Sequence, residues 1–214
     1  MSKTTWFPML TALVGASICV ALFRFNTLPH SYEEYLVTNI LCLLWLPMVL
    51  IFVVGRKEPA QFGFTQGDPR TGYRIAGLLF LGLIPLMLIA CRLPSFQSYY
   101  PIQKGAETSL AFFAYFELTY GMYLFCWEFF FRGFLLFGLQ PLIGNWSIFL
   151  QAIAFGALHH GKPPMEELSS YVAGIILGVV ALRAKSFVPC FVLHWTAALT
   201  FDVLVILAKR HMIF

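Results

Sequence analysis

Long apolar runs separated by short polar segments dominate this chain. From the N-terminus, seven runs rich in Leu, Ile, Val, Phe and Ala lie at about 8–23, 35–54, 73–90, 109–139, 146–158, 168–182 and 187–208. A helix crosses the hydrocarbon core of a bilayer with roughly 20 mainly apolar residues. The pattern therefore predicts an all-α bundle of seven or eight transmembrane helices that form one integrated membrane domain.

The composition places these helices in lipid. Of the 214 residues, 59% are hydrophobic and only 11% are charged, whereas soluble domains carry about 25% charged residues. The formal net charge of +4 is small, and the sequence holds no basic run of the kind that follows a phosphate backbone. We therefore expect a multi-pass membrane protein that is surrounded by the lipid bilayer and has no nucleic-acid partner.

The polar segment 55–74 sets the expected orientation. Its basic residues outnumber its acidic ones, with Arg56, Lys57, Arg70 and Arg74 against Glu58 and Asp68. By the positive-inside rule this loop lies in the cytoplasm. We divide the predicted membrane domain into N-terminal helices within 1–107 and a C-terminal helix core at 108–208, and we expect the active-site cavity in the C-terminal half.

Ionisable residues inside the apolar runs, or in the short segment between two of them at 159–167, are concentrated in that C-terminal half. They are Glu117, Glu128, Arg132, His159, His160, Lys162, Glu166, Glu167, His194 and Asp202. Such residues face the bundle interior and need partners, because a charge at mid-membrane costs about 3 kcal/mol even on insertion scales. Glu128 and Arg132 are four residues apart and can form an ion pair on one helix face. A structural clamp would explain that pair alone, but two histidine segments with carboxylates match the requirements of a zinc or proton-transfer site.

Other intramembrane chemistries have less support in the sequence. The HExxH pattern of zinc proteases does not occur, and the only aspartates are Asp68, in a loop, and Asp202. No GxSx-type stretch lies in a predicted span. Cys190 and His194 are four residues apart, so a thiol–imidazole dyad is geometrically feasible. That dyad leaves the ionisable residues of the other helices unexplained.

The order and spacing of these residues resemble the CPBP intramembrane metalloproteases, which include type II CAAX prenyl endopeptidases and bacteriocin-processing proteins. That family carries EExxxR, FxxxH and HxxxN, or a similar small polar residue at the end, on successive membrane helices. Here the corresponding residues are Glu128 and Arg132 in WEFFFRG, His159 in FGALH, and His194 with Ala198 four residues later. The resemblance covers roughly 109–208.

The sequence departs from the family pattern at two positions. The family uses the first glutamate of the pair to activate the attacking water, and Trp127 stands there. Ala198 stands where an asparagine-like side chain would hydrogen-bond an oxyanion. Three polar residues are candidates to compensate: Glu128, Glu166 and Asp202.

The resemblance implies a metal-dependent or glutamate-dependent endopeptidase that cleaves a membrane-associated protein or peptide. The expected catalytic residues are Glu128, Arg132, His159, His194, Glu166 and Asp202. We expect His159 and His194, with Glu166, to hold a zinc ion or the catalytic water. The carboxylate that takes the proton from this water is expected to be Glu128 or else Glu166.

The remaining expected residues have supporting roles. Arg132 would keep Glu128 ionised and oriented, and Asp202 would orient His194 or complete the ligand set. We expect the protein in the cell membrane, with the bacterial inner membrane as the favoured location. Two rival functions stay open: a catalytically inactive protein of the same fold that binds peptides as an immunity or accessory protein, and a transporter with a proton relay.

Overall fold

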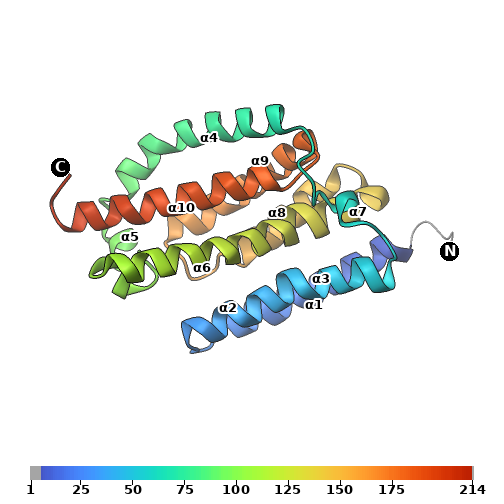
Figure 1. Ribbon diagram of the computed structural model, residues 1–214, viewed down its shortest axis with the longest axis horizontal. Helices are drawn as coiled ribbons and strands as arrows, with labels where there is room; N and C mark the ends of the chain where they lie inside the picture. Colours follow the sequence, from blue (N-terminus) through green and yellow to red (C-terminus); the bar gives the residue numbers. More distant parts are fainter. Residues whose placement is uncertain (1–5, 214) are drawn as a thin grey trace.

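The computed structural model of the protein describes residues 6–213 and consists of helices joined by short loops (Figure 1). Residues 1–5, with which the predicted N-terminal region begins, lie outside the described residues. The α-helices are α1 (Trp6–Asn26), α2 (Tyr32–Ile40), α3 (Leu46–Val49), α4 (Pro69–Ala90), α5 (Pro94–Tyr99), α6 (Leu110–Glu128), α7 (Leu136–Ile143), α8 (Trp146–Ala157), α9 (Pro164–Ala184) and α10 (Val188–Lys209). The part of the chain that is described contains no β-strand, which confirms the predicted all-α class.

Six helical stretches within residues 6–213 are long and apolar enough to cross a membrane. They are Trp6–Asn26, Tyr32–Val54, Pro69–Ala90, Leu110–Ile143, Pro164–Ala184 and Val188–Lys209. The second joins α2 and α3 through π-helical turns, and the fourth joins α6 and α7 in the same way. Helix α8 is apolar but has only 12 residues, fewer than the roughly 20 of a full span. The seven predicted runs thus correspond to six spanning stretches and one shorter helix.

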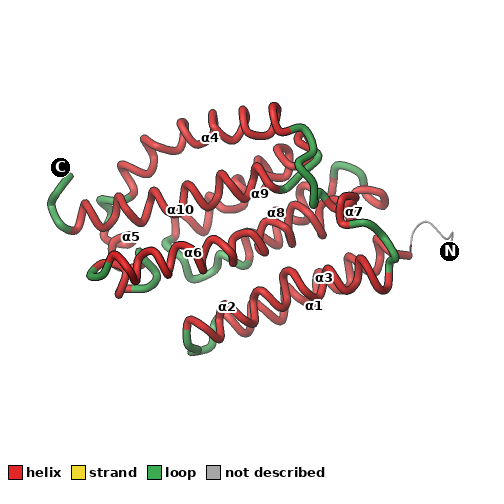
Figure 2. The backbone as a smooth tube through the Cα atoms, in the orientation of Figure 1, coloured by secondary structure: helices red, strands yellow, loops and turns green. Residues whose placement is uncertain are grey.

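The stretch Leu110–Ile143 forms the centre of the bundle. In its most apolar window 83% of the residues are buried, against 11–33% in the other five stretches. Figure 1 shows α1, α2 and α3 on one side of α6, and α10 and then α4 on the other side. The loops gather at the two ends of the helices (Figure 2). Polar side chains of this central stretch are therefore enclosed by protein and shielded from lipid.

A π-helical turn at Phe129–Leu135 interrupts the central stretch directly after Glu128. Such turns occur mostly as single insertions in α-helices and often at functional sites. Gly133 lets the backbone of the loop before α4 approach this turn, because a Cβ atom at Gly133 would lie 2.8 Å from the carbonyl oxygen of Phe62. The wide turn holds a glutamate and an arginine side by side in the core.

The loop before α4 is anchored to the connection between α9 and α10. The Asp68 backbone N–H donates to the carbonyl oxygen of Ala184 at 2.7 Å. The Asp68 side chain caps α4 by accepting from the N–H of Thr71 at 3.1 Å. The Thr71 side chain and then the Thr71 N–H lower the pKa of the Asp68 carboxyl group. The loop thus fixes where α4 begins relative to α9 and α10, the two helices that it faces along the bundle.

Candidate active site

A fully buried ion pair lies at the end of α6. Glu128 and Arg132 both have 0% exposed side chains, and Arg132 Nη1 donates to Glu128 Oε1 at 3.1 Å. The Arg132 guanidinium also stacks over the Phe155 ring of α8, with 3.9 Å between Cζ and the ring centroid. The pair that the sequence predicted is therefore formed, and an aromatic face contributes to holding the cation.

His194 of α10 contacts the same carboxylate oxygen. Its Nδ1 lies 2.7 Å from Glu128 Oε1. A carboxylate only accepts hydrogen bonds, so Nδ1 carries the proton and donates it. In the neutral ring, Nε2 is then the basic nitrogen, and the Glu128 carboxylate orients it. The three side chains form a connected series from Arg132 through Glu128 to His194.

His159, just after the end of α8, also uses its Nδ1 atom for a hydrogen bond within the protein. Its Nδ1 lies 2.8 Å from the carbonyl oxygen of Phe155, an acceptor, so its Nε2 is also the free basic nitrogen. Burial, followed by the nearby Lys162 ammonium, lowers the His159 pKa well below its ordinary value. The imidazole is therefore neutral near pH 7 and able to accept a hydrogen bond or a proton at Nε2.

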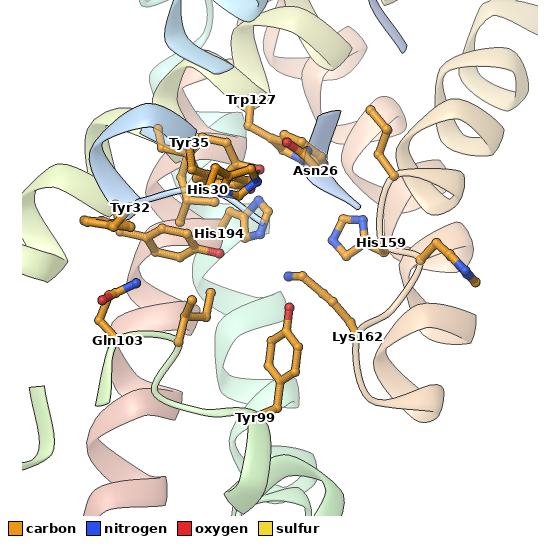
Figure 3. Close-up of a pocket in the computed structure, with 16 residues that line it drawn as sticks. Asn26, His30, Tyr32, Tyr35, Tyr99, Gln103, Trp127, His159, Lys162 and His194 are labelled. Carbon is orange, nitrogen blue, oxygen red and sulfur yellow. Dashed lines mark hydrogen bonds between the residues drawn. The ribbon is translucent and has the colours of Figure 1, made fainter. Parts of the chain in front are cut away.

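Both histidines line a polar cavity of about 270 Å³. Its other walls include Tyr35, Tyr99, Tyr120, Tyr123, Trp127 and Lys162, and we call it the tyrosine cavity. Figure 3 shows His159, His194 and Lys162 pointing toward one another across an open space, with the Tyr99 hydroxyl directed toward Lys162. Two basic nitrogens and one ammonium group thus converge on a single polar volume.

The same two histidines also line a second, mainly apolar cavity of about 380 Å³. It is bounded by residues of α4, α9 and α10, and we call it the α4 groove. Its lining also includes the polar side chains of Glu166, Ser169, Ser170 and the two histidines. The histidine pair therefore stands between a polar cavity and an apolar groove.

Glu166 borders the α4 groove but is engaged by other partners. Lys162 Nζ donates to its Oε1 at 2.8 Å, and the Tyr100 hydroxyl lies 2.7 Å from both of its oxygens. Burial lowers the pKa of Lys162, but the Glu166 carboxylate and neighbouring tyrosines outweigh this and hold that pKa well above its ordinary value. Glu166 thus neutralises a buried ammonium group. Its i,i+4 spacing to Lys162 was readable in the sequence, whereas nothing in the sequence pointed to Tyr100.

Asp202 lies beside Glu117 of α6. The two side chains are close neighbours, and both are buried, with 2% exposure for Asp202 and 3% for Glu117. Neither Glu117 oxygen, nor Asp202 Oδ1, has a hydrogen-bond partner within the described residues. The neighbour of Asp202 in this arrangement is therefore a second carboxyl group, while the Nδ1 of His194 is occupied by Glu128.

Trp127 and Ala198 are the two positions at which the sequence departs from the family pattern. Trp127 is 3% exposed, lines the tyrosine cavity, and packs edge-on to His159 with 5.7 Å between ring centroids. Its Nε1–H has no hydrogen-bond partner within the described chain. Ala198 packs against the main core. The Cys190 thiol donates to the Leu177 carbonyl oxygen of α9, so its hydrogen bond is directed away from His194.

The described side chains around the two histidines offer fewer ligands than a zinc ion needs. Catalytic zinc takes three protein ligands of the His, Cys, Asp or Glu type. Among residues 6–213, no group of three such side chains is arranged to hold a metal ion. The two free imidazole nitrogens provide two donors, and the nearby Glu166 is bound to Lys162. The described residues thus provide fewer ligands than a resident zinc ion needs, and the zinc predicted from the sequence is a question for metal analysis.

Comparison with known proteins assigns the segment that carries this site. Residues 108–200 match the family described as Type II CAAX prenyl endopeptidase Rce1-like. A search among curated proteins finds no match, and neither does a search among solved structures. The matched segment contains Glu128, Arg132, His159 and His194, the residues on which the sequence resemblance rests. In this multi-pass membrane protein, residues 108–200 are therefore similar to the type II CAAX prenyl endopeptidase family, and this match supports the resemblance to CPBP intramembrane proteases that the sequence indicated.

Proposed function

We propose that this protein is a membrane-embedded endopeptidase that hydrolyses a peptide bond of a membrane-associated protein or peptide. The family of its C-terminal segment is a protease family. The observation that carries the proposal is the double contact of Glu128, with Arg132 at 3.1 Å and His194 at 2.7 Å, beside a cavity that both histidines line. A carboxylate that orients an imidazole toward a polar cavity is a recognised arrangement for general-base catalysis.

In the proposed reaction His194 acts as the general base. Its Nε2 takes a proton from a water molecule in the cavity as the water oxygen attacks the peptide carbonyl carbon. The Glu128 carboxylate stabilises the imidazolium that forms, and Arg132 holds that carboxylate in place through the ion pair at 3.1 Å. His194 then returns the proton to the amine that leaves when the C–N bond breaks. The full burial of Glu128 supports a role through His194 rather than direct contact with water.

His159 and Lys162 would position and stabilise the reacting groups. The free Nε2 of His159 can accept a hydrogen bond from the attacking water and so hold it between the two histidines. The Lys162 ammonium lines the same cavity and can stabilise the negative charge that develops on the carbonyl oxygen. This assignment supplies the electrostatic role that Ala198 cannot perform. We further propose the cell membrane, and the bacterial inner membrane in particular, as its location.

The experiment compares membranes from cells that express wild type or variants. Mass spectrometry of newly formed peptide termini detects cleavage of any protein or peptide in these membranes. The variants Glu128→Gln, His159→Ala and His194→Ala are expected to reduce termini formation by about 10²- to 10⁴-fold, the usual contribution of a general base. His211→Asn, outside the membrane-spanning stretches, is the matched control and should retain wild-type cleavage. Wild-type cleavage by all three site variants would rule out the protease function.

One observation favours a second function, a catalytically inactive peptide-binding or accessory protein of the same fold. Trp127 places an aromatic wall in the tyrosine cavity at the position where the family has its principal glutamate. If the second function is correct, wild type produces no new termini and yet retains peptides in its cavity. Metal analysis of the purified protein tests zinc separately from both functions.

A further inference from the structure

Glu166 and Tyr100 contact the Lys162 ammonium group at the wall of the tyrosine cavity. Lys162 lines this cavity, and its Nζ donates to Glu166 Oε1 at 2.8 Å and lies 3.5 Å from the Tyr100 hydroxyl oxygen. Glu166 lines the α4 groove instead. Of the described residues that line the tyrosine cavity, none is an aspartate or a glutamate. Lys162 thus brings a positive charge to the cavity, and the carboxylate that compensates this charge stands outside it.

Tyr100 links this carboxylate to α10. Its hydroxyl lies 2.7 Å from both Glu166 oxygens and donates to one of them. The buried Tyr100 ring packs edge-on to Phe201 of α10, with 5.3 Å between ring centroids. The Tyr100 backbone carbonyl accepts from Lys209 Nζ, at the end of the same helix, at 2.9 Å. The helix that carries His194 therefore also fixes the tyrosine that holds Glu166.

The Lys162 ammonium keeps a donor for the cavity. An ammonium group has three N–H donors, and one of them serves Glu166. The distance of 3.5 Å to the Tyr100 oxygen is longer than the usual N–H···O range of about 2.7–3.2 Å. Figure 3 shows the Lys162 side chain pointing toward His159 and His194. A charged donor thus faces the same polar volume as the two basic imidazole nitrogens.

We infer that Glu166 and Tyr100 are positioning residues of the site, which hold the Lys162 ammonium charged and in place to bind the carbonyl oxygen of the substrate. This inference rests on the proposed function, in which that oxygen gains negative charge during the reaction. Glu166, expected from the sequence to hold a metal ion or take a proton, and Tyr100, not singled out there, both act through Lys162 without touching the substrate.

The charge of Lys162 depends on Glu166. Burial favours the neutral amine and lowers the Lys162 pKa, but Glu166 and then Tyr100 raise it, so that it stands well above its ordinary value. Without the Glu166 carboxylate the effect of burial would remain, and the ammonium would lose its proton at a lower pH. The other ionisable groups that influence Lys162 or are influenced by it come from several elements: Tyr35 of α2, Tyr99 of α5, Tyr120 of α6, His159 after α8 and Asp202 of α10.

The first test measures the charge of Lys162 without any cleavage. Acetic anhydride acetylates only unprotonated amines, and mass spectrometry follows its reaction with Lys162 in the full-length protein from about pH 7 to about pH 11. Glu166→Gln should lower the pH of half-maximal reaction by about one unit or more. Tyr100→Phe should lower this midpoint by less, because Glu166 keeps its charge but loses its link to α10. Glu167→Gln is the matched control, since Glu167 pairs with His160, and should match wild type.

The second test is the pH profile of termini formation in membranes. Between pH 7 and pH 9, Glu166→Gln should lose about tenfold or more of its activity, because its Lys162 loses the proton that makes it an oxyanion donor. Wild type should show no such loss. The double variant Glu166→Gln/Lys162→Arg should remove most of this pH dependence, since a guanidinium stays protonated without a carboxylate beside it. A purely structural pair predicts a loss at every pH that arginine does not repair.

Three results would overturn the inference: an unchanged Lys162 midpoint in Glu166→Gln, equal shifts in Glu166→Gln and Glu167→Gln, or a pH profile that arginine does not restore. An unchanged midpoint in Tyr100→Phe would remove Tyr100 from it. The midpoint does not depend on cleavage, so the two proposals can fail separately. A shifted midpoint in a protein that forms no new termini would remove the protease function, whereas new termini with an unchanged midpoint would remove the positioning role alone.

Discussion

The imidazole of His194 is held by Glu128, with 2.7 Å between Nδ1 and Oε1, although 66 residues separate them in the chain. The contact joins α10 to the end of α6. The Arg132 ion pair alone would explain why the Glu128 carboxylate is buried. The contact with His194 gives the carboxylate a second role, because it orients a histidine that borders two cavities. Glu128 is therefore expected to influence stability through Arg132 and reactivity through His194.

Replacing Arg132 by methionine should strongly destabilise the fold. The change leaves the Glu128 carboxylate buried without its cation, and breaking a buried pair in this way costs about 3–5 kcal/mol. Thermal or denaturant unfolding in detergent measures the loss. Glu167→Gln is the matched control, because it removes a partner of the more exposed His160–Glu167 pair and should cost about 1 kcal/mol or less. Equal losses in the two variants would contradict the buried-pair interpretation.

Replacing Trp127 by phenylalanine should leave cleavage largely intact. The indole Nε1–H has no partner within the described residues, and phenylalanine retains an aromatic ring beside His159. We expect less than about a tenfold change in termini formation, against about 10²- to 10⁴-fold for Glu128→Gln. The termini assay compares both variants directly. A loss as large as that of Glu128→Gln would instead give the indole a direct part in the reaction.

Replacing Asp202 by asparagine tests whether this residue serves the site or only the fold. Asp202 lies near Glu117, and its Oδ1 has no hydrogen-bond partner within the described residues, so an amide of the same size breaks no contact that the structure shows with His194. We expect unchanged cleavage and a free energy of unfolding within about 1 kcal/mol of wild type. His194→Ala in the same membranes provides the reference for a damaged site. A cleavage loss comparable to that reference would restore the predicted role of Asp202 toward His194.

The Lys162–Glu166 pair should stabilise the fold independently of pH over the neutral range. The folded-state pKa of Lys162 is raised above its ordinary value of 10.5, so its stabilisation is fully present below that value and is lost as pH rises through the folded pKa. The difference in unfolding free energy between wild type and Lys162→Met should stay constant from about pH 6 to about pH 9. Denaturant unfolding across this range measures it.

The double variant Lys162→Met/Glu166→Gln supplies the control for that measurement. If the two side chains stabilise each other, its loss should be smaller than the sum of the two single losses. The two side chains do not stabilise each other if the two single losses in unfolding free energy simply add. The same conclusion follows if the difference in unfolding free energy between wild type and Lys162→Met decreases from about pH 6 to about pH 9.

Much of the fold was predictable because lipid imposes a simple rule on sequence. Backbone polar groups in a bilayer must be satisfied within helices, so each apolar run becomes a helix. The ion pair of Glu128 and Arg132 was also predictable, since residues four apart on one helix are neighbours. The π-helical turn at Phe129–Leu135 was not, because the apolar pattern of these residues is the same for a π-helical and an α-helical turn.

The sequence by itself determined the class of fold, the helix that carries the ion pair and the four residues that match the protease family. Local spacing and hydrophobicity are sufficient for these. The tertiary structure alone decided which carboxylate contacts which histidine: Glu128 contacts His194, Glu166 binds Lys162 and Tyr100, and Asp202 lies beside Glu117. These pairings join different helices, and the packing angle and depth of each helix in the bundle are set by contacts along its whole length.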